Sequence, residues 1–149
     1  MTRAIFLALM LCALLPAQAA TVLLDDSQSQ VLAPQLALQW RSISPAQGDH
    51  QVTGNTRVQI RLNTQAHVGK TGRIFMALPA QPGGLVNVQW QTQGMFINGQ
   101  LVSGSRSLVW QGKITQAMLE DVMSISLQTD GRTLQSQQAL RFHFELDLP

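Results

Sequence analysis

The stretch LRFHFELDL, residues 140–148, alternates strictly between large apolar and polar side chains. Successive side chains of a strand point to opposite faces of a sheet, so this period of two predicts a strand with one buried face and one wetted face. Strands of that kind are typical of antiparallel sheets. The side chains that we expect on the buried face are Leu140, Phe142, Phe144, Leu146 and Leu148.

The same alternation recurs upstream, most clearly at residues 57–64 and 86–93. Shorter strands are expected at residues 31–41, 72–78, 107–110 and 123–129. Asn98-Gly99 favours a type I′ hairpin turn, and residues 115–121 are the one helical candidate. We therefore predict an all-β fold, an antiparallel immunoglobulin-like β-sandwich of about seven to nine strands with one short helical turn. A closed barrel is the alternative.

The amino-terminal residues have the features of an export signal. Arg3 precedes an apolar run at residues 4–15, and Ala17-Gln18-Ala19 offers small residues at a cleavage site. The run is too short for a membrane span, which needs about 20 residues, and bulky Leu11 before Cys12 disfavours a lipoprotein. The predicted organisation is a signal peptide at 1–19, an N-terminal extension at 20–33 and a β-sandwich domain at 34–149. We expect export to the periplasm or the cell surface, with no transmembrane segment in the mature chain.

The composition is unusually poor in charge. Only 12% of the 149 residues are charged, against about 25% in an average globular protein, whereas 20 residues are Gln. The formal net charge of +2 comes without clusters of Lys and Arg, which argues against a nucleic-acid partner. Cleavage of the signal removes the single cysteine, Cys12, so the mature chain has neither thiol chemistry nor disulfides.

No motif for catalysis or metal binding emerges. His50, His67 and His143 lack the close spacing that aims two rings at one metal ion. Gly69-Lys70-Thr71 lacks the upstream glycine of a phosphate-binding loop and is interpreted as a turn. Asp25-Asp26 and Glu120-Asp121 are neighbours in sequence, which does not place two carboxylates across a cleft. We expect no enzyme, no catalytic residues, no cofactor and no metal site.

The tryptophans and the glutamines admit two interpretations each. Trp40, Trp90 and Trp110 lie in phase with apolar neighbours, which favours the core over a sugar-stacking platform. The row of amides on the polar face of residues 86–93 suits packing against another uncharged protein surface, or is simply a soluble face.

The two ends of the mature chain carry a resemblance to a known family. Residues 21–33 form an extension with Val22 and Leu24 ahead of the domain, and the chain closes on the alternating strand at 140–148. With the signal peptide and a domain of similar size, this resembles bacterial fimbrial subunits of the chaperone–usher kind. The chain lacks the cysteine pair and the penultimate aromatic common in that class, and Asp25-Asp26 interrupts the extension.

The resemblance implies an incomplete sandwich that is filled by the extension of the next subunit. Val22 and Leu24 would then belong to the donor segment, and the five apolar side chains of residues 140–148 would line the acceptor groove. The implied partners are other fibre subunits, a periplasmic chaperone and an outer-membrane usher. We therefore expect an exported, non-enzymatic subunit or accessory of a surface fibre, with a periplasmic ligand- or glycan-binding module as the alternative.

Overall fold

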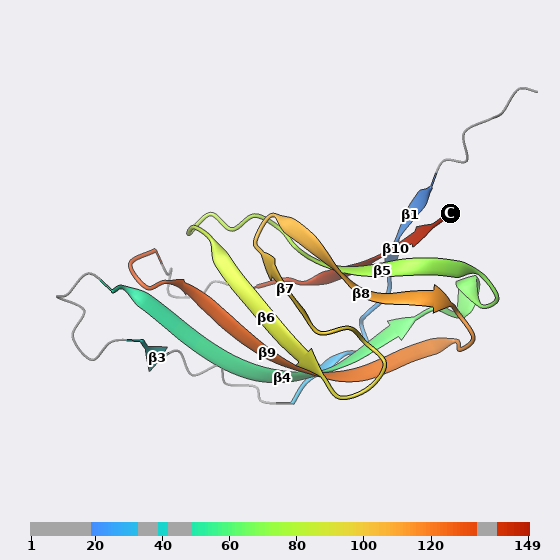
Figure 1. Cartoon of the computed structure of the whole chain (residues 1–149), viewed down its shortest axis with the longest axis horizontal. Coiled ribbons are helices and arrows are strands. Elements are labelled where there is room, and N and C mark those ends of the chain that lie inside the picture. Colours follow the sequence, from blue (N-terminus) through green and yellow to red (C-terminus); the bar gives the residue numbers. More distant parts are fainter. Residues whose placement is uncertain (1–18, 33–38, 42–48, 134–139) are drawn as a thin grey trace, which may run out of the picture.

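The chain forms two antiparallel sheets that pack face to face (Figure 1). The structure is a computed structural model that describes residues 19–32, 39–41, 49–133 and 140–149. The first sheet, sheet A, has the order β1-β10-β5-β8 and contains β1 (Ala20–Leu24), β5 (Thr71–Leu78), β8 (Ser105–Lys113) and β10 (His143–Leu148). The second, sheet B, has the order β2-β4-β9-β6-β7, with β3 pairing β4 beside β2. Its strands are β2 (Gln30–Val31), β3 (Gln39–Trp40), β4 (Gln51–Asn63), β6 (Val86–Thr92), β7 (Gly99–Val102) and β9 (Met118–Asp130).

The prediction of an all-β antiparallel sandwich is confirmed. All strand pairs in the described residues are antiparallel. The two-residue strands β2 and β3 bring the number of described strands above the expected range. The predicted signal peptide lies outside the described residues except for Ala19, and within the part that the structure covers no helix has the length and hydropathy to cross a membrane.

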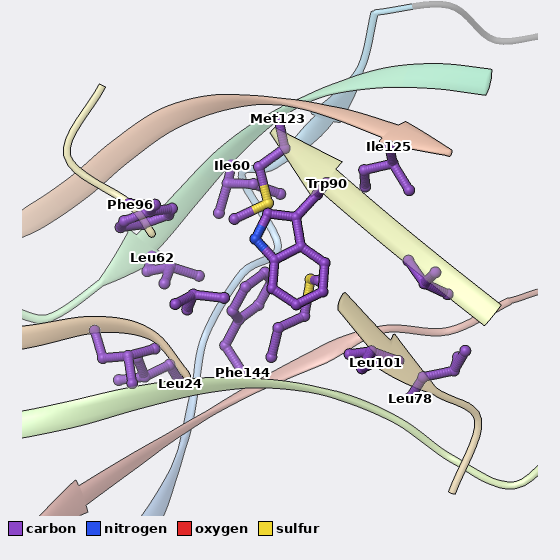
Figure 2. Close-up of a cluster of buried hydrophobic side chains, with 14 of the residues drawn as sticks. Leu24, Ile60, Leu62, Leu78, Trp90, Phe96, Leu101, Met123, Ile125 and Phe144 are labelled. Carbon is purple, nitrogen blue, oxygen red and sulfur yellow. The ribbon is translucent and has the colours of Figure 1, made fainter. Parts of the chain in front are cut away.

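The core lies between the inner faces of the two sheets (Figure 2). Period-two alternation puts Ile74 and Leu146 of sheet A opposite Leu62 and Trp90 of sheet B, and all four are at most 2% exposed. The indole of Trp90 lies in the middle of this cluster, and its Nε1 donates to the carbonyl of Ile97 at 2.8 Å. Burying the only polar atom of the ring with a partner removes the cost of desolvating it.

The expected helical turn at residues 115–121 is wrong. Strand β9 begins at Met118, and Leu119, Asp121 and Met123 alternate into the buried side. The period of two was not evident from the sequence because a charged residue, Asp121, occupies one of the buried positions. Its Oδ2 and Oδ1 accept hydrogen bonds from the backbone N–H of Phe96 and Val122 at 2.8 and 2.7 Å. The one helical turn of the described residues is a 3₁₀ turn at Gln65–His67.

The type I′ turn at Asn98-Gly99 is also wrong, because neither residue has the positive φ that this turn requires. Gly99 instead opens β7 opposite Trp90. A Cβ at Gly99 would lie 2.6 Å from the indole, so glycine is needed for close approach of the ring rather than for a turn. Asn98 closes the connection by accepting the backbone N–H of Thr92 at 2.8 Å.

Candidate functional site

Strands β1 and β10, which are far apart in the sequence, meet in the structure. β1 runs antiparallel to β10, from Ala20 opposite Leu148 to Leu24 opposite Phe144. β10 also pairs with β5, so the carboxy-terminal strand is an inner strand and β1 forms the edge of sheet A. Figure 1 shows the blue β1 and the red β10 side by side at one end of the molecule.

The side chains predicted to mediate interaction line the inner side of this strand pair. Leu24, Phe144 and Leu146 are at most 4% exposed and belong to the core. The others are half-buried: Val22 lies opposite Leu146, and the core is flanked by Leu140, Phe142 and Leu148. β10 begins only at His143, so Leu140 and Phe142 precede the strand that had been expected to include them.

The outer side of the same strand pair carries a charged network, here called the Arg106 network and made of Thr21, Arg106, Glu145 and Asp147. Arg106 of β8 donates two hydrogen bonds to Asp147, both at 3.1 Å, and one to Glu145 at 2.9 Å. Thr21 of β1 donates its hydroxyl hydrogen to Asp147 at 2.7 Å. The network thus connects both edges of sheet A through the strand that lies next to β1.

Two more side chains extend this network. The guanidinium of Arg106 lies 4.3 Å from the centre of the Phe75 ring, a cation–π geometry. His143 Nε2 lies 3.0 Å from Glu145 Oε1. Arg106 is therefore surrounded by an aromatic face and two carboxylates, which holds its charge in a fixed position on the sheet.

The electrostatics of the network keep it ionised. The hydrogen bonds from Arg106, and then the one from Thr21, lower the pKa of Asp147 below the ordinary value of an aspartate. In turn the hydrogen bond to Asp147 raises the pKa of Arg106. At neutral pH Asp147 is a carboxylate that accepts from Thr21, so the charge state of β10 favours the docked position of β1.

Sequence reasoning missed Thr21, Arg106 and Asp147 as a group. The alternation in residues 140–148 does place Glu145 and Asp147 on the polar side of the strand. Nothing in the sequence indicates that Arg106, 41 residues before Asp147, faces them across β5. Two acidic residues spaced by two on a predicted strand were the one available signal for a basic partner.

The other candidates are dispersed. Trp90 is in the core as expected, and Trp110 is partly buried and packs against the core. The expectation for Trp40 is wrong, because β3 is a two-residue strand at the sheet edge and the tryptophan is 51% exposed. In the described ranges, no three His, Cys, Asp or Glu residues gather as metal ligands. The segment at Gly69-Lys70 is a turn with a positive φ at Gly69, leading into β5.

Comparison of the chain with protein-family models, with characterised proteins and with solved structures finds no match. The site therefore has to be interpreted from its own geometry.

Proposed function

We propose that this protein is an exported, non-enzymatic subunit or accessory of a bacterial surface fibre and that it joins its neighbours by exchanging strand β1. The observation that carries the proposal is the position of β1: a five-residue strand at a sheet edge that, among the described strands, pairs only with β10. A strand in this place can add to the β10 of another copy as readily as to its own.

The contacts of β1 favour exchange over permanent attachment. Leu24 is its only fully buried side chain, while Leu23 is 67% exposed. The connection to β2 runs through a short turn in which Asp25 accepts the backbone N–H of Ser27 at 2.9 Å. Straightening this turn would let β1 reach another subunit, where the same register restores every hydrogen bond that was lost. Identical contacts in both states make the two nearly equal in free energy.

The remaining features of the proposal follow from the sequence. The predicted signal peptide supports a location in the periplasm or at the cell surface. The proposed protein partners, which the resemblance to fimbrial subunits implies, are other fibre subunits, a periplasmic chaperone and an outer-membrane usher. A chaperone would cover β10 while β1 is undocked, since an unpaired strand edge invites aggregation.

Disulfide capture tests the exchange. Leu23 and Glu145 are directly opposite each other, and the mature chain is expected to lack cysteine, so Leu23→Cys and Glu145→Cys can be introduced in separate proteins. After the two proteins are mixed and oxidised, we expect covalent heterodimers on a non-reducing gel. The matched control mixes Leu23→Cys with Gln89→Cys, which lies on the outer face of sheet B and should remain uncrosslinked.

A double variant with both cysteines in one chain tests the opposite possibility, that β1 stays paired with β10 of its own chain. If it forms only an internal disulfide, and mixtures of the single variants never crosslink, the domain is self-contained and the fibre proposal is wrong.

A further inference from the structure

The outer face of sheet B is hollowed into an open groove of about 860 Å³ that crosses β4, β9, β6 and β7. Figure 1 shows β4 and β9 running side by side along the length of this sheet. A volume of this size is within the range of ligand sites in proteins, roughly 300–1,000 Å³.

The hollow has a simple origin in side-chain length. The central strand β9 presents two small residues, Ser124 and Ser126, as the floor. Opposite them in register, β4 presents Arg57 and Asn55, and β6 presents Gln91 and Gln89. Long side chains on both flanks of short ones form two walls along the strand direction. Gln100 of β7, opposite Gln89, extends the second wall.

The side chains that project into the groove offer hydrogen bonds. Apart from Arg57, its outward side chains are amides and hydroxyls, which serve as both donors and acceptors. Trp90 and Ile125 also border the groove, but both side chains are at most 4% exposed and belong to the core beneath it.

Arg57 is the single charged side chain of the lining. In contrast to the side chains of Arg61 and Arg106, which form ion pairs, the guanidinium of Arg57 has no hydrogen-bond or ion-pair partner among the residues of the described ranges. A guanidinium with an open fork of donors suits a carboxylate, which it can bind through two parallel hydrogen bonds.

We propose that this groove binds an acidic oligosaccharide, with Arg57 pairing with a sugar carboxylate and the flanking amides hydrogen-bonding to hydroxyls. Sugar hydroxyls are donors and acceptors at once, as are the Gln and Asn side chains of the walls. One cationic group matches a sparsely charged chain better than a polyanion such as nucleic acid, which requires several phosphate contacts. The two apolar lining residues, Trp90 and Ile125, are buried, and a groove without an exposed apolar side chain argues against a peptide anchored by hydrophobic residues. This binding activity does not depend on the exchange of β1.

Calorimetric titration of the exported protein tests the proposal with three carboxylated probes: trigalacturonic acid, a trimer of alginate and 3′-sialyllactose. We expect at least one to bind, and its neutral methyl ester to bind about tenfold or more weakly, since a charge-assisted pair is lost. Arg57→Gln should weaken binding of the acid by a similar factor and leave binding of the ester unchanged. Arg73→Gln is the matched control, because Arg73 is also an exposed strand arginine but lies on β5 of the other sheet.

A second variant tests the place of binding. Ser126→Phe fills the floor of the groove and should abolish binding of acid and ester alike, with circular dichroism confirming that the protein is folded. Three results would each overturn the proposal: none of the three probes binds, Arg57→Gln and Arg73→Gln weaken binding equally, or Ser126→Phe leaves binding intact. Because disulfide capture measures exchange of β1 and the titration measures sheet B, failure of one proposal is distinguishable from failure of the other.

Discussion

The outer faces of the two sheets differ although both arise from the same alternation of apolar and polar residues. On sheet A the outward positions hold opposite charges that pair across strands, with Arg106 between Glu145 and Asp147. On sheet B the outward positions that line the groove hold amides, hydroxyls and Arg57, whose guanidinium has no partner among the described residues. A cross-strand ion pair of this face, Arg61 with Glu120 at 3.4 Å, lies outside the groove.

This difference separates stability from recognition. Polar groups that satisfy one another contribute to the fold, because breaking them leaves a partly buried charge without a partner. Polar groups that only face water contribute little to folding and are available to a ligand. We therefore expect substitutions in the Arg106 network of sheet A to alter unfolding and those in the groove of sheet B to alter binding.

The largest effects should come from the inner faces, where the comparison predicts no difference between the sheets. Trp90→Ala in sheet B and Phe144→Ala in sheet A should each lower the free energy of unfolding by about 3–5 kcal/mol, since both are buried aromatic side chains. Urea denaturation followed by circular dichroism measures the loss. Trp40→Ala removes an exposed ring and should cost about 1 kcal/mol or less.

A small cost for Phe144→Ala, comparable with that of Trp40→Ala, would break this part of the comparison. It would mean that β10 is not stabilised by the core it contacts, and that sheet A is held mainly by its outer network.

The sequence predicted the inner faces far better than the outer ones. Alternation in residues 140–148 and 86–93 identified Phe144, Leu146, Val88 and Trp90 as core, because burial follows from local periodicity. It failed at the first residues of β9, where the buried Asp121 interrupts the apolar positions, although the strand predicted at residues 123–129 does lie within β9. The pairing of β1 with β10 and the reach of Arg106 depend on strand order, which joins residues far apart in the chain and leaves no local pattern. Likewise the amides at 86–93 were evident, but the groove also required Ser124 and Ser126 on a neighbouring strand.

An intermediate effect is expected from the Arg106 network of sheet A. Asp147→Asn keeps the size of the side chain but loses the charge that Arg106 and Thr21 contact. Because Arg106 is partly exposed and screened by solvent, we expect a loss of about 1 kcal/mol at neutral pH. Amide hydrogen exchange in β1 should accelerate in the same variant, since Thr21 loses its charged acceptor.

The pH dependence of unfolding sharpens this prediction. The pKa of Asp147 is lower in the folded protein than in the unfolded chain, where it is about 3.9. Its contribution is therefore fully present above that value and is lost as pH falls through the lower, folded pKa. The neighbouring side chains Arg73, Arg106, Glu145 and His143 are kept in Asp147→Asn, so the stability curves of the two proteins should begin to converge below about pH 4 and meet as pH falls through the folded pKa of Asp147. Curves that stay parallel down to pH 2 would show that Asp147 is not linked to folding.

The smallest effect on stability should come from Arg57, and this is where the comparison is most informative. Arg57→Gln removes a charge that no described residue compensates, so its free energy of unfolding should stay within about 0.5 kcal/mol of the original protein. The same substitution is expected to weaken binding of a carboxylated sugar about tenfold. If Arg57→Gln leaves the free energy of unfolding unchanged but weakens ligand binding, this arginine serves recognition alone. A marked loss of stability would instead place Arg57 in the same class as Arg106 and remove the distinction between the two outer faces.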